Sequence, residues 1–323
     1  MTDTTENSLP TMNAPASKPN FSVSTTDEFT AFSRAFLVRE DAVILLAQLT
    51  QLVKAAQRHR GISMGMLAGN TDFHNEFELL QRQLERRLAM LQAFAQSSEH
   101  LTVRDKENLS HAWQTIRSNW EGDKLSDNFE LHSHFIEQLV GIIAGLAKKL
   151  EAPLLASQHD ESFSDGVLNA LSKSSMCQQA EILNFIGRVL PETIEQVARI
   201  RGFSAYAVVV GSLDGLDERK IRYWVKALRQ HSNDTLLQAL TPSLSMNGVM
   251  SSLSLITPNE QKLLQFLDAV ESALFKGKGG RDQAHELFNA ATDIIEIYWE
   301  IVAEGLTEVQ AWHRRALESW VFA

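Results

Sequence analysis

The sequence predicts an all-α fold, and three features of the chain support this. Apolar side chains recur at three-, four- and seven-residue steps along most of the chain, as on one face of a helix. No segment shows the apolar–polar alternation of a half-buried strand, and Pro, Asn and Gly separate the periodic stretches where helices would begin and end. With 44% apolar and 22% charged residues in a chain of 323, the composition is that of an ordinary globular protein that can bury a substantial core.

Four helices are expected in the first half of the chain. Residues 1–25 are mostly small and polar, so we predict a flexible tail that cannot bury enough apolar surface to fold. A capping-box pattern at residues 25–28 predicts the start of a long first helix, with Arg60 near its far end. Three more helices are expected to begin near residues 72, 102 and 126.

The second half is expected to repeat this plan after a linker at residues 151–164. Pro191 stands where the first turn of a helix tolerates proline, so a helix should begin there. The helix that contains Leu228 should end before a separate short helix at about residues 234–246, and one long final helix should run from Arg281 to about residue 320. The predicted architecture is two four-helix-type bundles related by an internal repeat, at about residues 26–150 and 165–320, with long first and last helices.

A motif used twice is the main clue to function. Residues 60–63 read Arg-Gly-Ile-Ser and residues 201–204 read Arg-Gly-Phe-Ser; each copy follows an amphipathic helix and continues through small and apolar residues to a glycine. If the two copies pack together, they bring two guanidinium groups into one partly buried place, and an uncompensated buried charge is costly. The arrangement requires an anion, which is either a protein carboxylate or a bound ligand. A planar oxyanion suits guanidinium groups better than a halide does.

Charge and composition narrow the class of protein. The formal net charge of −10 disfavours a nucleic-acid surface, although a local basic face at Arg82, Arg86 and Arg87 keeps an RNA-binding regulator as an alternative. The single cysteine, Cys177, excludes an internal disulfide framework. We find no secretory signal and no apolar run long enough to span a membrane, so a cytoplasmic protein without a membrane partner is expected.

The chain shows no pattern typical of catalysis or metal binding. His132 and His134 stand two residues apart, which points them to different sides of a helix, and no metal-binding spacing of histidines occurs. No nucleophile motif or catalytic pair of carboxylates is recognisable. We therefore expect a protein that is not an enzyme and that has neither a metal site nor a cofactor.

The doubled motif resembles that of the nitrate- and nitrite-sensing (NIT) domain family of bacterial signal-transduction proteins. The resemblance covers roughly residues 35–320 and rests on residues 59–69, residues 199–211 and residues 288–295 of the final helix. It implies two four-helix bundles that bind nitrate or nitrite at their interface through arginines from both halves. Both anions fit two arginine forks, so both stay candidates.

The resemblance also implies the residues of the site. Arg60 and Arg201 match the motif arginines. His59 stands where the family can show a second arginine, which would make nitrate affinity pH-dependent if His59 must be charged. Arg58 or Arg199 could substitute from an adjacent face, and Arg281, at the start of the last helix, is expected as an additional ligand.

The expected function is therefore nitrate or nitrite sensing in the regulation of nitrate assimilation. The sequence shows no output module after about residue 320, so the conformational change should pass to an output protein supplied in trans, or to a second copy in a homodimer. A ligand-free helical adaptor that retains the fold is the alternative, and buried arginine–carboxylate pairs would favour it.

Overall fold

The computed structural model describes residues 24–69, 73–96, 98–152, 176–211, 215–240, 248–275 and 281–321. The regular structure in these ranges is entirely helical, which confirms the predicted all-α fold class. None of the helices in this part of the chain is long and apolar enough to cross a membrane.

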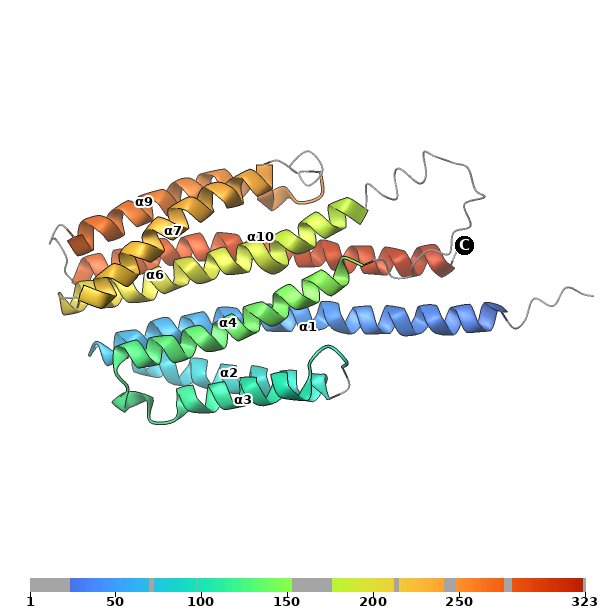
Figure 1. Ribbon diagram of the computed structural model, residues 1–323, viewed down its shortest axis with the longest axis horizontal. Helices are drawn as coiled ribbons and strands as arrows, with labels where there is room; N and C mark the ends of the chain where they lie inside the picture. The colour runs from blue at the N-terminus through green and yellow to red at the C-terminus, as the bar shows by residue number, and fades with distance from the viewer. Residues whose placement is uncertain are drawn as a thin grey trace, which may run out of the picture.

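The first half forms one group of neighbouring helices, in which α1 packs on α2 and α4, and α3 packs on α2 and α4 (Figure 1). A capping box begins α3, because Thr102 and Asp105 each accept a hydrogen bond from the other's backbone N–H. A short 3₁₀ turn, η2, lies between α3 and α4. The bounds are α1 Ser24–Leu67, α2 His74–Ala95, α3 Val103–Arg117, η2 Trp120–Gly122 and α4 Leu125–Leu150.

The second half forms another group, in which α6 packs on α7, α9 and α10, and α9 packs on α7 and α10. A helical stretch at residues 176–184 passes through the π-helical turn η3 directly into α6. The bounds are η3 Phe185–Val189, α6 Leu190–Val210, α7 Gly215–Leu240, η4 Ser251–Leu255, α9 Ile256–Phe275 and α10 Arg281–Val321.

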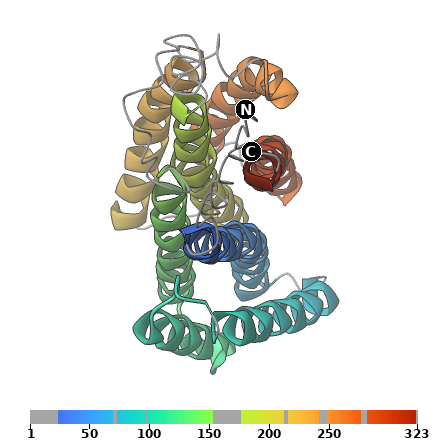
Figure 2. The ribbon, with the colours of Figure 1, turned by 90° about the vertical axis from the view of Figure 1, so that its right-hand side faces the viewer.

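The two groups share a continuous core of buried apolar side chains. Figure 2 shows the helices of both groups end-on. Helix α1 packs on α6 and α10, and α4 packs on η3 and α6, so α1 and α4 lie between the outer helices of the first group and the whole second group. Helices α1 and α10 run antiparallel, and at one end Phe36 of α1 stacks on His313 of α10 with ring centroids 3.9 Å apart. The relation of the two groups by an internal repeat stays a prediction.

One predicted helix start is confirmed, and one predicted break between helices is wrong. Helix α6 begins at Leu190 with Pro191 in its first turn, as expected, although the preceding helical stretch runs into it without a loop. The π turn at residues 185–189 directly precedes this proline, which lacks the N–H that a regular helical hydrogen bond needs. Helix α7 continues through Asp234, because the neighbouring polar residue Ser232 is buried and donates a hydrogen bond to the carboxylate of Glu260 on α9.

Much of the predicted tail and linker lies outside the described residues. This applies to the tail at residues 1–25, apart from the start of α1, and to the linker at residues 151–164 beyond residue 152.

Candidate functional site

The two copies of the motif pack against each other where α1 meets α6. A Cβ atom at Gly61 would lie 3.2 Å from Cε2 of Phe288 and 3.8 Å from Nη2 of Arg201. A Cβ atom at Gly202 would lie 3.1 Å from Sδ of Met64. Both motif glycines therefore allow side chains of the other half to approach their helix closely.

Arg60 is fully buried and is paired with a carboxylate. Its Nη1 donates hydrogen bonds to Oε1 of Glu195, at 2.6 Å, and to Oγ of Ser133, at 2.9 Å, while Nη2 donates to Oε2 of Glu195 at 3.2 Å. The guanidinium also lies over the ring of Phe129, with Cζ 5.1 Å from the ring centroid. The pair with Glu195 is bidentate, which is the strongest geometry for these groups.

Glu195 of α6 collects several donors on one buried carboxylate. Besides Arg60, it accepts hydrogen bonds from Nε2 of Gln57, at 2.9 Å, and from Nε of Arg199, at 2.8 Å. Burial by itself would raise the pKa of Glu195, but the charges and hydrogen bonds of Arg60 and Arg199 outweigh it and hold this pKa below its usual value. The carboxylate is therefore ionised at neutral pH and compensates the charge of Arg60.

Arg201 is also buried, but among the described residues it donates hydrogen bonds only to neutral groups. Nη1 donates to Oγ1 of Thr292 at 3.1 Å, and Nη2 donates to the backbone oxygen of Gln57 at 3.3 Å. Its Cζ lies 4.8 Å from the ring centroid of Phe288. Within the described ranges, its Nε has no hydrogen-bond acceptor and no carboxylate oxygen lies within the 4.0 Å of an ion pair.

The pKa of Arg201 reflects this setting. Burial, and then the nearby charge of Arg60, lower this pKa from its usual value to about 10, although Glu195 and Glu296 act in the opposite direction. A pKa of about 10 leaves the group protonated at neutral pH. Arg201 is therefore a buried cation that lacks a counter-ion among the residues that the structure describes.

The contacts of the two arginines otherwise correspond closely. Phe129 and Ser133 stand one turn apart on α4, and Phe288 and Thr292 stand one turn apart on α10. Each arginine thus has a phenylalanine ring beneath it and a hydroxyl acceptor for Nη1.

The motif serines correspond as well. The hydroxyl of Ser63 donates to the backbone oxygen of Arg60 at 3.0 Å, and that of Ser204 donates to the backbone oxygen of Arg201 at 3.4 Å. The marked difference between the two places is the carboxylate of Glu195.

Three other predicted site residues have varied surroundings. Arg199 is partly buried and bonds both Glu195 and Glu137, so it lies at the edge of the arginine cluster. Arg58 is exposed and pairs with Glu76 of α2, its Nε lying 2.9 Å from the carboxylate. Arg281 begins α10, and its side chain lies outside the described residues.

His59 belongs to a buried histidine pair. Its Nδ1 lies 2.8 Å from Nε2 of His132, whose Nδ1 lies 2.8 Å from the backbone oxygen of Asn128. Because a carbonyl only accepts, Nδ1 of His132 carries a proton, and the Nδ1–H of His59 then donates to Nε2 of His132. Among the described residues, Nε2 of His59 has no hydrogen-bond partner, and the His59 ring contacts the rings of Phe77 and Trp113.

Both histidines are neutral at neutral pH. Burial, followed by the neighbouring His132, lowers the pKa of His59 well below 6.5. Burial also lowers the pKa of His132 to about 4, helped by the charge of Arg60 and opposed by the bond to Asn128. A neutral His59 adds no positive charge for an anion.

Sequence reasoning missed several residues around the arginines. Glu195 carries the only direct signal, because it stands four residues before Arg199, the spacing of an ion pair on one helix face. Gln57, Ser133 and Phe129 carry no signal that sets them apart from ordinary helix residues.

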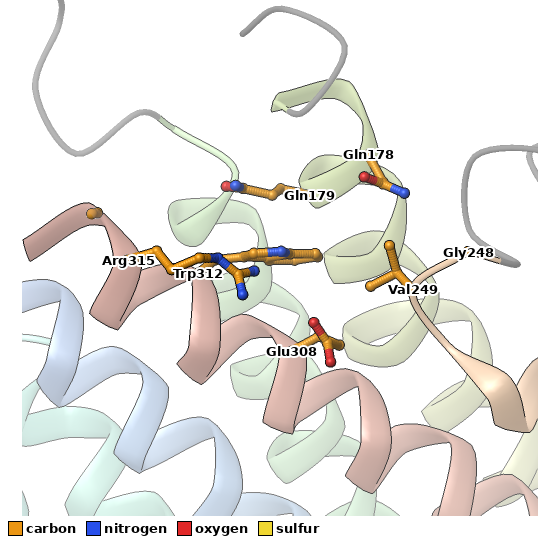
Figure 3. A pocket seen from close by; sticks show the side chains of 8 residues that line it. Gln178, Gln179, Gly248, Val249, Glu308, Trp312 and Arg315 are labelled. Atoms are coloured by element: carbon orange, nitrogen blue, oxygen red, sulfur yellow. The ribbon is translucent and has the colours of Figure 1, made fainter. Parts of the chain in front are cut away.

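A pocket of about 680 Å³ lies elsewhere, between the far end of α10, the helical stretch 176–184 and the segment 248–249 (Figure 3). Trp312, Arg315 and Glu308 of α10 face it from one side, and Gln179 faces it from the other. None of the motif arginines lines this pocket. No group of three or more His, Cys, Asp or Glu residues in the described ranges is arranged to hold a metal ion.

Comparisons with protein-family models, with curated proteins and with solved structures find no match for this chain. The resemblance to the NIT family therefore stays a prediction, and the geometry around Arg60 and Arg201 is the evidence on function.

Proposed function

We propose that this protein is a sensor of a small oxyanion, nitrate or nitrite, which binds at the contact of α1, α6 and α10 beside Arg201. The observation that carries this proposal is the buried guanidinium of Arg201, which donates to neutral acceptors and whose Nε–H has no acceptor in the part of the chain that the structure describes. A buried cation of this kind is costly unless an anion compensates it.

The chemistry of the group favours a planar oxyanion. A guanidinium donates paired N–H groups in one plane, so two oxygens of nitrate or nitrite can accept from Nε and one Nη together. Gly61 has no side chain, so the backbone of α1 lies close to Arg201, and a Cβ atom there would be 3.8 Å from Nη2. Chloride offers a single centre and matches this geometry less well.

An anion at this place would contact both groups of helices, because α1 belongs to the first group and α6 and α10 belong to the second. Its binding would stabilise one relative arrangement of the two groups, and that arrangement is the signal. We propose a cytoplasmic regulatory protein of nitrate assimilation that passes this signal to an output protein in trans or to a second copy. The proposal involves no catalysis.

Calorimetric titration with sodium nitrate, with sodium nitrite and sodium chloride alongside, tests the proposal. We expect saturable binding of nitrate or nitrite by the wild type and its loss in Arg201→Met. Arg222→Met is the matched control, since Arg222 also lies over a phenylalanine ring, that of Phe275, but on the surface and paired with Glu218. Absence of binding in the wild type, or equal binding by Arg201→Met, would contradict the proposal.

A second candidate is a ligand-free adaptor, and the buried pair of Arg60 and Glu195 favours it, because this pair shows that the protein compensates one motif arginine internally. An adaptor would show no heat of nitrate binding and no rise in melting temperature with nitrate. The same titration, with a thermal melt in nitrate beside it, separates the two candidates.

A further inference from the structure

The two motif arginines differ in the residue that stands six positions before each of them. Glu195 precedes Arg201 at this spacing on α6, and Lys54 precedes Arg60 at the same spacing on α1. Because the helices cross, each of these residues is placed to reach toward the opposite half. Glu195 does so and pairs with Arg60.

Lys54 cannot do the same for Arg201, because it carries a positive charge. Its Nζ instead pairs with Glu296 of α10, at 2.5 Å. Glu296 stands one turn after Thr292, just as Glu137 stands one turn after Ser133. The surroundings of Arg201 thus repeat those of Arg60 with a lysine in place of the buried glutamate.

The carboxylate of Glu195 accepts the hydrogen bonds that a planar oxyanion bound at Arg60 would accept. Its two oxygens accept from Nη1 and Nη2 of Arg60, and Gln57 and Arg199 donate to the same carboxylate. Gln57 also links the two places, since its side chain donates to Glu195 while its backbone oxygen accepts from Arg201.

We propose that Glu195 is a built-in anion that occupies the Arg60 half of the site, so that one free oxyanion binds per chain, at Arg201. This inference rests on the proposed function. In it, Glu195 sets both the number of anions and their affinity, because its negative charge lies close enough to Arg201 to repel an anion bound there. Arg60 then serves to hold Glu195 and is not a ligand of the free anion.

The test compares nitrate binding by the wild type, Glu195→Gln and the matched control Glu137→Gln in the same calorimetric titration. Glu137→Gln removes a carboxylate that also bonds Arg199 but that lies outside the contact with Arg60. We expect Glu195→Gln to bind nitrate roughly tenfold more tightly or better, and Glu137→Gln to remain within about threefold of the wild type.

A double variant, Arg60→Met with Glu195→Met, keeps the test decisive if Glu195→Gln fails to fold. Replacing a buried ion pair by apolar side chains of similar volume is usually tolerated. Since the pair is neutral overall, we expect one bound nitrate per chain, with an affinity within about threefold of the wild type.

The outcomes separate this inference from the proposed function. Two outcomes would overturn the role of Glu195 and leave the oxyanion sensor intact, provided that the wild type binds nitrate. The first is unchanged or weaker binding by Glu195→Gln, and the second is loss of binding in the double variant. Binding by Glu195→Gln alone would support the built-in anion and refute sensing by the wild type. No binding by any of these variants would overturn both.

Discussion

Arg60 and Arg201 occupy matching places in the two halves of the molecule, and their electrostatic surroundings are opposite. Each lies over a phenylalanine ring and donates to a hydroxyl one turn further along the same helix. Within the described residues, a carboxylate pairs with Arg60 and none pairs with Arg201. The motif therefore fixes the position of a buried arginine, while a residue on the opposite helix determines whether the charge is compensated.

The largest expected effect is the difference in stability between Arg60→Met and Arg201→Met. Arg60→Met leaves Glu195 buried with only its contacts to Arg199 and Gln57, so we expect a loss of about 3–5 kcal/mol in the free energy of unfolding. Arg201→Met removes a cation that lacks a counter-ion, and we expect a change of about 1 kcal/mol or less, or a gain. Urea unfolding followed by circular dichroism without nitrate measures both. Equal losses would show that the two places are not electrostatically different.

A second difference is sensitivity to acid. His59 directly precedes its motif arginine, and Ile200 stands at the corresponding place in the second half. His132 and Ala291 likewise correspond, because each stands three residues after the phenylalanine that lies under a motif arginine. At these corresponding positions, therefore, only the first half has the buried histidine pair. The pKa of His132 is lowered to about 4, so the unfolded chain binds more protons between that pH and 6.5. Stability should therefore fall as the pH drops through this range, by up to about 3 kcal/mol.

The variant His59→Leu with His132→Leu tests this origin. It should flatten the slope of unfolding free energy against pH between about 6.5 and 4 while leaving the slope above 7 unchanged. Glu195 is present in both proteins and serves as an internal reference. Because its pKa is lower in the folded chain than in the unfolded chain, where it is about 4.5, Glu195 stabilises the fold above that pH and loses this effect as the pH falls further. A wild-type slope that persists in the variant would assign the acid sensitivity to other groups.

The smallest expected effect distinguishes the two motif glycines. A Cβ atom at Gly61 would press on the ring of Phe288 and come close to Arg201, whereas one at Gly202 would meet the flexible end of Met64. We expect Gly61→Ala to cost about 1–2 kcal/mol and Gly202→Ala to be neutral within about 0.5 kcal/mol, since the gain in helix propensity offsets a small shift of the thioether. Thermal melts of both variants measure this, and a greater loss for Gly202→Ala would reverse the expected order.

Helical periodicity was sufficient to predict the class of fold and most elements, because the apolar stripes of α2, α4 and α10 are long and regular. The sequence also singled out Arg60 and Arg201, since the doubled motif marks them. It could not tell Arg58 from Arg199, which look alike in their motifs yet pair with different helices, α2 and α4.

The partner of Arg60 was beyond sequence reasoning for the same reason. Glu195 lies on another helix, and only the crossing of α1 and α6 decides that it meets Arg60 and not Arg201. Pro191 correctly marked the start of α6, but no residue of the sequence indicated that the preceding helical stretch joins α6 through a π turn without a break.

The π turn at residues 185–189 also determines how the central helix can move. A Cβ atom at Gly187 would overlap that of Ala147 on α4, and a Cβ atom at Gly305 of α10 would lie 2.6 Å from Cγ2 of Ile186. The helix is thus held between two neighbours at one point, which lies about 20 Å along its axis from Arg201. Close packing at this point opposes sliding of the helix, so we expect the arginine-bearing end to move by a tilt about residues 186–187, which would displace residues 176–184 in the opposite direction.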